Sequence, residues 1–164
     1  MEDQQYIIDE LINTYAEAYH NLGHSSLMGK IVALLLTTEE PLSLDEISER
    51  LKMSKGPISQ ISRKLKEHQL IERVWIPGER KDYYKAKDDI FGQAFRNYSK
   101  NMRKNEYIAD SFITKLNAKG PNGLIHLELR MKEMKLFYSL MSKHHKAFLE
   151  EWMQVKNQAE TETV

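Results

Sequence analysis

The order of secondary-structure signals between residues 26 and 86 constrains the fold of this chain most strongly. Apolar residues at helical spacing predict three consecutive helices in this stretch. Two runs rich in β-branched and aromatic residues then flank a Pro77-Gly78 turn, a pattern typical of a β-hairpin. The helices are expected over residues 26–37, 43–51 and 54–68, and the strands over residues 71–76 and 82–86.

Local start signals mark the second and third of these helices. Ser43 and Glu46 are spaced as a capping box, in which the serine oxygen accepts from one free amide and the glutamate from another. Ser54 supplies a start signal for the third helix, and Pro57 lies in its first turn, where the missing N–H would be unpaired anyway. Only a short turn is therefore expected between these two helices.

Helical patterns flank this stretch on both sides. Residues 3–22 repeat apolar residues on one face, and residues 88–118 do the same with one interruption expected near residues 103–106. A loop at residues 119–123 precedes a last helix, 124–155, whose near-heptad apolar seam is too long for one small domain to bury. The polar tail, residues 157–164, is expected to fray.

Charge is segregated along a chain whose net charge is zero, with 24 basic and 24 acidic residues. Residues 1–51 hold 10 acids and 2 bases, residues 52–87 hold 4 acids and 10 bases, and residues 88–164 hold 10 acids and 12 bases. A basic block of this kind is the electrostatic footprint of a polyanion-binding face, because each cation near a phosphate releases condensed counterions.

Several classes of protein are excluded or disfavoured by the sequence. The chain has no Cys, which excludes disulfides, thiol catalysis and thiolate metal sites. Its longest apolar run, residues 31–36, is far shorter than the roughly 20 residues that cross a bilayer, and the first residues lack the basic segment of a secretory signal. Neither a nucleophile elbow nor a phosphate-binding loop is present. We therefore expect a cytoplasmic protein that is not an enzyme and holds no cofactor.

The order of elements predicts a winged helix-turn-helix, in which a short helix braces a second one that enters the major groove of DNA. The expected fold class is mainly α with a small β-hairpin wing. We divide the chain into an N-terminal dimerisation helix (1–25), a winged helix-turn-helix domain (26–87), a helical dimerisation region (88–156) and a flexible tail (157–164).

The third helix of the winged domain has one apolar and one donor-rich face. Rotation by about 100° per residue places Ser54, Ile58 and Leu65 on the same side as Ile61. The tip of the hairpin is narrow and basic enough to place a guanidinium in a minor groove. We expect the following residues to contact double-stranded DNA: Ser54, Lys55, Gly56, Ser59, Gln60, Arg63, Lys64, Lys66, Arg80 and Lys81.

The aromatic residues of the hairpin have two possible roles. Trp75, Tyr83 and Tyr84 are favoured as strand residues that anchor the hairpin to the core. A role as stacking platforms for bases is the less favoured alternative.

The segments "MSKGPIS" (53–59) and "VWIPGERKDYY" (74–84) lie within a stretch, residues 34–86, that resembles the GbsR-type branch of the MarR superfamily of transcriptional regulators. The resemblance implies a winged-helix DNA-binding domain, homodimerisation through N- and C-terminal helices, and repression. Named members of this branch control the uptake or synthesis of osmoprotectants. The DNA-reading role would fall to Lys55, Ser59, Gln60, Arg63 and Arg80.

Two further sets of residues follow from the flanking helices. The homodimer contacts are expected at apolar positions of the first and last helices: Ile8, Leu11, Tyr15, Met134, Phe137, Met141, Phe148 and Trp152. An effector such as choline or glycine betaine would suit a cage of aromatic faces, which attract quaternary ammonium groups. The candidate cage residues are Tyr15, Tyr19, Phe91, Phe95 and Tyr98.

Two other functions stay open at this point. A metal-responsive, zinc-type regulator is suggested by His20 and His24 with Glu17 nearby, and by the pair His144 and His145. Satisfied or solvated histidines are favoured, so no metal site is expected. A protein-interaction adaptor that does not bind DNA is the second alternative.

Overall fold

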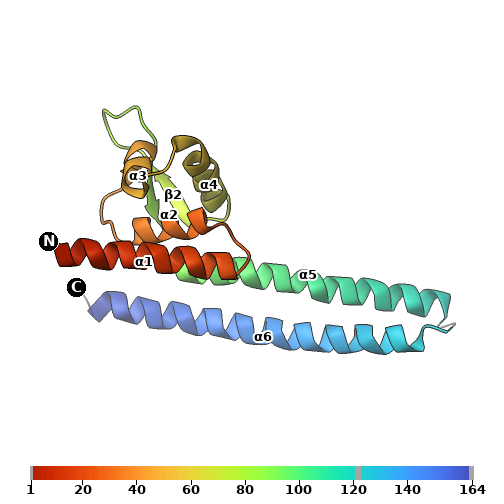
Figure 1. Cartoon of the computed structure of the whole chain (residues 1–164). Helices are drawn as coiled ribbons and strands as arrows, with labels where there is room; N and C mark the ends of the chain where they lie inside the picture. The colour runs from red at the N-terminus through yellow and green to blue at the C-terminus, as the bar shows by residue number, and fades with distance from the viewer. Residues whose placement is uncertain (1, 121–122, 163–164) are drawn as a thin grey trace. The chain divides into compact units, whose positions relative to one another are not determined.

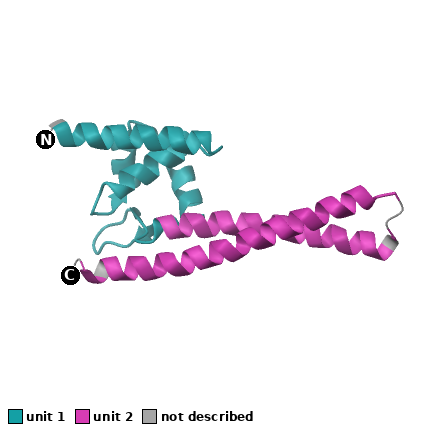
Figure 2. Cartoon of the chain, turned by 90° about the horizontal axis from the view of Figure 1, so that it is seen from below, with its two compact units in different colours: residues 1–90 teal, residues 91–164 magenta. Residues whose placement is uncertain are grey.

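The computed structural model describes residues 2–120 and 123–162, which form two compact units, residues 1–90 and residues 91–164 (Figures 1 and 2). The chain is mainly helical with a small antiparallel sheet, which confirms the predicted fold class. None of the helices within the described ranges combines the length and the apolar character needed to cross a membrane.

Unit 1, residues 1–90, contains the winged helix-turn-helix. Apart from the strand Leu42–Ser43, its elements follow the predicted order, with boundaries within a few residues of those expected. They are α1 (Glu2–Asn21), α2 (Ser26–Leu36), β1 (Leu42–Ser43), α3 (Leu44–Leu51), α4 (Lys55–Glu67), β2 (Ile71–Val74) and β3 (Tyr83–Ala86).

Helix α2 is the centre of unit 1. It lies between α1 on one side and α3, α4 and the sheet on the other (Figure 1). Its residues 31–35 are all buried, and Ile47, Ile58 and Leu65 pack around it with no exposed surface. Truncating one such residue to Ala costs about 2–5 kcal/mol, because the substitution leaves a cavity and reduces the apolar surface that folding buries.

The sheet has three strands in the order β1-β3-β2, so the hairpin gains a strand that the sequence analysis did not expect. Strand β1 pairs with β3 through Leu42 opposite Tyr84 and Ser43 opposite Tyr83. Two residues are too few to produce a recognisable alternation of apolar and polar positions. Tyr84 is buried beneath this sheet, which confirms its expected role as an anchor.

Two tight turns give unit 1 its shape. Lys52 adopts the left-handed conformation after α3, with φ of 52°, and the Met53 amide donates to the Ser48 carbonyl at 3.0 Å. In the wing, Gly78 has φ of +87°, and the Glu79 amide donates to the Ile76 carbonyl at 3.1 Å. Pro77 followed by a residue with positive φ is the requirement of a type II turn, so the predicted turn is confirmed.

Unit 2 is an antiparallel pair of long helices, α5 (Ile90–Lys119) and α6 (Ile125–Glu162), which run side by side (Figure 2). The first residue of α5, Ile90, belongs to unit 1. Lys135 forms an ion pair with Asp110, and the Ser139 hydroxyl donates to Glu106. The rings of Phe95 and Phe148 lie 4.7 Å apart.

Two predictions for unit 2 were wrong. The expected interruption near residues 103–106 is absent, because α5 is continuous between residues 90 and 119 and Glu106 is held by Ser139 and Ser142 of α6. The expected frayed tail from residue 157 is helical to Glu162. That segment contains neither Gly nor Pro, so nothing in it stops the helix, and Thr161 donates to the Asn157 carbonyl. Residues 163–164 lie outside the described ranges.

Gly29 should be the least replaceable glycine of the fold. A Cβ on it would overlap the Tyr15 carbonyl oxygen of α1, so the two helices would have to separate. We expect Gly29→Ala to lower the free energy of unfolding by about 1–3 kcal/mol. Urea unfolding measures this change.

The matched control for this prediction is Gly56→Ala, in the first turn of α4, where nothing lies within 4 Å of an added Cβ. It should change the free energy of unfolding by less than about 1 kcal/mol, because the helix preference of Ala is opposed by the crowding that a Cβ meets before Pro57. Equal effects of the two substitutions would contradict the close helix approach.

Candidate nucleic-acid interface

Helix α4 separates its buried and exposed residues cleanly. Ile58, Ser62 and Leu65 are buried against the core of unit 1. On the other side Gln60, Arg63, Lys64 and Lys66 are exposed, and Ser59 is half-buried. One placement was wrong: Ser54 does not share the core side but is exposed at the N-cap position, before the first helical residue. The exposed face therefore carries only donors and cations until Glu67.

The cations of this face are not neutralised by the protein. Within the described part of the chain, no carboxylate forms an ion pair with Arg63, Lys64 or Lys66. The first turn of α4 has no acidic residue, so its free amides and its positive dipole end are also available to an anion. The face can therefore accept phosphate oxygens and base acceptors without first breaking an ion pair of these three residues.

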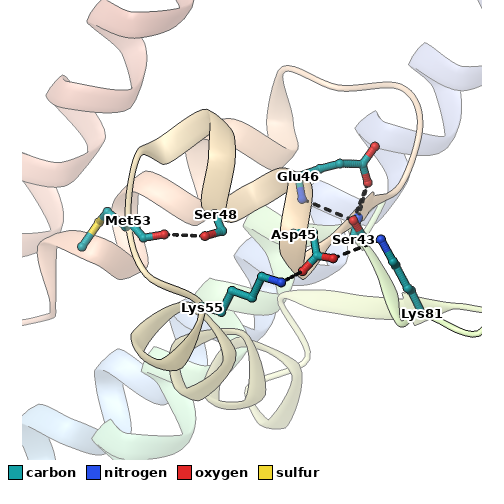
Figure 3. A network of polar contacts seen from close by, with 7 residues as sticks. All are labelled: Ser43, Asp45, Glu46, Ser48, Met53, Lys55 and Lys81. Carbon is teal, nitrogen blue, oxygen red and sulfur yellow. Dashed lines mark hydrogen bonds and ion pairs between the residues drawn. The ribbon is translucent and has the colours of Figure 1, made fainter.

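Asp45, in the first turn of α3, links the start of α4 to the wing (Figure 3). Its Oδ1 lies 2.6 Å from Lys55 Nζ and its Oδ2 lies 3.0 Å from Lys81 Nζ. The hydrogen bonds from Lys55 and then Lys81 hold the pKa of Asp45 below its usual range. The same contact raises the pKa of Lys81. One carboxylate therefore positions two of the predicted DNA contacts, one at the start of α4 and one in the wing.

The position of Asp45 depends on the capping box of α3. The Ser43 amide and hydroxyl donate to Glu46 Oε2 at 2.7 and 2.6 Å, and the Glu46 amide donates back to Ser43 Oγ at 3.3 Å. The hydrogen bonds from Ser43 lower the pKa of Glu46. The capping box predicted from the sequence is confirmed. At the other end of α3, the Ser48 hydroxyl donates to the Met53 carbonyl and holds the turn into α4 (Figure 3).

The wing has ion pairs along its strands and a free cation near its tip. Arg73 pairs with Asp82 at 2.6 Å and Lys85 pairs with Glu72 at 3.2 Å. Arg80 is exposed, and no described residue forms an ion pair with it. Arg80 is thus the wing cation that can reach an external anion most readily.

Trp75 corrects the expectation for the hairpin aromatics. It lies just beyond β2 and is 74% exposed, so it does not anchor the wing to the core as Tyr84 does. Strand β2 ends at Val74, two residues earlier than expected, because the Pro77-Gly78 turn begins at Ile76. Burial raises the pKa of Tyr84, consistent with its place under the sheet.

The residues expected to pair two chains are used partly within one chain. Ile8, Leu11 and Tyr15 pack against the core of unit 1, and Phe148 contacts Phe95 of the same unit. Helical spacing alone does not say which partner an apolar face meets. Met134, Met141 and Trp152 are half-buried and Phe137 is 56% exposed. The pairing role of all these residues stays a prediction.

Sequence reasoning did not single out a different apolar stripe on α6. Its members recur at steps of four and seven residues, which places them on one side of the helix. They are Ile125, Leu129, Leu136 and Leu140, and each is more than half exposed.

The expected aromatic cage is distributed over both units. In unit 1, Tyr15 and Tyr19 are stacked at 6.2 Å, and burial together with Tyr15 raises the pKa of Tyr19. In unit 2, Phe95 and Tyr98 lie 6.3 Å apart and Phe91 is exposed. The structure therefore contains both aromatic pairs. Their joint role in binding an effector stays a prediction.

The histidines do not gather into a metal centre. Among residues 2–120 and 123–162, no group of three or more His, Asp or Glu could hold a metal ion. Gly23, with φ of +80°, separates His20 at the end of α1 from His24. His145 instead contacts the ring of Phe95 at 4.9 Å.

Comparison with known proteins finds regulators of transcription. The HTH-type transcriptional repressor OpcR of Bacillus subtilis (strain 168) is 31% identical over 105 residues, which are 61% of this chain and 56% of that protein. The "Putative HTH-type transcriptional regulator YvaV" of the same organism is 32% identical over 83 residues, 51% of this chain and 47% of that protein. The chain spans about half the length of these curated relatives. It matches no family model.

A solved structure shares the fold over most of the chain. The crystal structure of a transcriptional regulator superposes with a TM-score of 0.76 and 24% sequence identity, covering 90% of this chain and 98% of the other. At that identity the likeness shows the fold alone. The named relatives belong to a class of proteins that are not enzymes, as the sequence analysis expects for this chain.

The link made by Asp45 predicts a measurable titration. In the folded chain the pKa of the Asp45 carboxyl should lie below its ordinary value of about 3.9. Because the folded pKa is the lower one, the two ion pairs stabilise the fold above pH ~4 and are lost as the pH falls through the folded value. Carbon-detected NMR titration of the carboxyl measures this pKa.

Substitutions separate the effects of Lys55 and Lys81 on the pKa of Asp45. Lys55→Met should raise the pKa of Asp45 most and Lys81→Met should raise it less, following the order of their contributions. Lys85→Met is the matched control, because Lys85 pairs with Glu72 instead. An unshifted Asp45 in the parent chain, or the same response to all three substitutions, would contradict the link.

Proposed function

We propose that this chain is a sequence-specific, double-stranded-DNA-binding regulator of transcription that acts as a homodimer. The observation that carries the proposal is the exposed face of α4, on which Arg63, Lys64 and Lys66 form no ion pair with a described residue, opposite a buried core face. Helix-turn-helix proteins place such a face in the major groove. The names of the two Bacillus subtilis relatives support the same role.

The residues of the face divide by chemistry. Arg63 and Gln60 are the candidates for base edges, because a guanidinium pairs bidentately with guanine and an amide with adenine. Lys64 and Lys66 lie farther along the same exposed side and suit phosphate oxygens. Arg80 near the tip of the wing suits the minor groove, where the potential is most negative.

Lys55 and Lys81 can bind DNA only in competition with Asp45, which holds both at ion-pair distance. All three groups are partly exposed, so solvent screens the two ion pairs and each is weak. A phosphate can therefore replace or share the Asp45 carboxylate without a large energetic penalty. Until then Asp45 keeps the start of α4 and the wing in register.

A second copy of this chain is the partner that the proposal requires. Two recognition helices must lie roughly 34 Å apart to enter successive major grooves of a pseudo-palindromic site. The exposed stripe of Ile125, Leu129, Leu136 and Leu140 on α6 supplies apolar surface for such pairing. The predicted contacts at Phe137 and Phe148 are also more than half exposed and can contribute.

Repression, the effector and the cellular location are proposed from the resemblance to the GbsR-type branch and from the relatives' names. One relative is named a repressor, which favours repression here. The aromatic pairs Tyr15–Tyr19 and Phe95–Tyr98 are available for a choline-like or betaine-like effector. A regulator of this kind acts in the cytoplasm.

Two substitutions test the reading of DNA by α4. With a duplex obtained by selection from random sequences, Arg63→Ala should cost about 1–3 kcal/mol of binding free energy and relax sequence preference. Lys66→Ala should weaken binding to all duplexes alike and reduce the salt slope by about 1. Fluorescence anisotropy at several salt concentrations measures both quantities.

The matched control is Lys132→Ala on α6, a cation paired with Glu128 and remote in sequence from the face. It should change neither affinity nor preference. Losses for Arg63→Ala that are equal on all sequences would contradict its role as a base reader. Unchanged binding for both α4 variants would favour the adaptor alternative.

The dimer is tested by charging the apolar stripe. Leu136→Glu combined with Leu140→Glu should convert the dimer to a monomer, because four negative charges would face one another across the pairing helices. Sedimentation equilibrium gives the mass, and circular dichroism shows whether the helices persist. Lys100→Glu, at an exposed position of α5 that no proposed contact uses, is the control. A mass of one chain in the parent protein would overturn the dimer.

A further inference from the structure

A groove in unit 2 carries chemistry that the proposed DNA-binding role does not use. It is formed by α5 and α6, has a volume of about 720 Å³, and lies wholly within residues 96–154. Four cations line it: Arg96, Arg103, Lys143 and Lys146. Glu150 is the acidic residue of the lining, so the local charge is strongly positive.

The two helices present their groove residues in register. On α5, Arg96, Ser99 and Arg103 are three and four residues apart and so share one face. On α6, His145 and Lys146 are three and four residues after Ser142, so both are its neighbours on the helix surface. Donors from both helices therefore line one groove. A site for a single ligand requires such an arrangement.

Two of the four cations, Arg103 and Lys143, are not balanced by a described residue. Both are exposed to solvent. Lys146 Nζ lies 3.9 Å from Glu150 Oε1, and both side chains are largely exposed to solvent. This ion pair is therefore weak. The groove is thus electrostatically unsatisfied, and an anion would lower its energy.

A buried hydroxyl in the groove points independently to a ligand. Ser99 is only 3% exposed, and its Oγ has no hydrogen-bond partner among the described residues. The Nδ1 atom of His145, also in the lining, is buried and equally unpartnered. Buried polar atoms are nearly always hydrogen-bonded, so two orphaned atoms in one basic groove need an explanation.

The ring of His145 is held in place by aromatic neighbours. It packs 4.9 Å from Phe95 and 5.7 Å from Tyr98, measured between ring centroids. Its unpartnered nitrogen is therefore fixed rather than free to turn toward water. The fixed ring and the buried hydroxyl are therefore preorganised, and the guanidinium groups of Arg96 and Arg103 line the same groove.

We propose that this groove binds a small organic molecule that bears a phosphate group. Guanidinium forks match phosphate oxygens in geometry and charge, and the dianion balances the excess of cations. Leu149 and Met153 give the lining an apolar part, and the volume is that of an organic ligand rather than of a lone phosphate ion. The site concerns unit 2 alone and stands whether or not the chain binds DNA.

The test is calorimetric titration of the full chain with phenyl phosphate, with inorganic phosphate as the arm that lacks an organic part. Phenyl phosphate should bind more tightly than inorganic phosphate. Arg103→Gln should weaken phenyl phosphate about tenfold, since it removes a charge-assisted hydrogen bond. Lys100→Gln, an exposed cation of α5 outside the lining, should change the affinity less than about twofold.

A second variant and a second readout protect the test from indirect effects. Ser99→Ala should weaken binding while leaving the melting temperature of the unliganded chain unchanged or higher, because it removes an orphaned hydroxyl. Ligand-induced amide shifts in NMR spectra should map to residues 96–103 and 142–154. Equal losses in Arg103→Gln and Lys100→Gln, shifts confined to α4 and the wing, or no heat with either probe would overturn the site.

Discussion

The hydrogen bonds of Ser43 are the contact on which the arrangement of unit 1 depends. This residue ends β1, where it pairs with Tyr83 of β3, and it also caps α3 through its reciprocal bonds with Glu46. The sheet and the first helix of the helix-turn-helix therefore meet at one buried residue. Asp45 is in the first turn of α3 for that reason, and from there it reaches both Lys55 and Lys81. A local capping signal thus determines the spacing of two elements that are distant in sequence.

The two units differ in how they use their apolar residues. In unit 1 the buried helix α2 holds α1, α4 and the sheet around one core, which fixes the direction in which α4 presents its exposed face. In unit 2 the long helices expose far more apolar surface, with Leu136 72% and Tyr107 75% exposed. Such surface is typical of a chain that associates with a partner. The same unit contains a basic groove whose unpartnered atoms indicate a ligand.

Much of unit 1 could be predicted from the sequence because its signals are local. The Ser43–Glu46 capping box, the Pro77-Gly78 turn and the two-sided pattern of α4 each lie within a few residues. Strand β1 could not be predicted, since two residues carry no periodicity. The bridge from Asp45 to Lys55 and Lys81 was also missed, because it depends on contacts between three separate elements. In α1 the apolar face was recognised but not its partner: Ile8, Leu11 and Tyr15 pack on the core of their own unit. The groove of unit 2 joins residues from 96 to 154, which no local pattern reveals.

The most direct test of the account is a binding titration of the full chain with a duplex selected from random sequences and with a scrambled version of that duplex. Fluorescence anisotropy at two salt concentrations gives four affinities. A sequence-specific regulator should bind the selected duplex about 10³-fold or more tightly than the scrambled one. Both affinities should fall as salt rises, because Lys and Arg release counterions from the phosphates. Equal, weak and salt-insensitive binding to both duplexes would contradict the central claim that α4 and the wing read DNA.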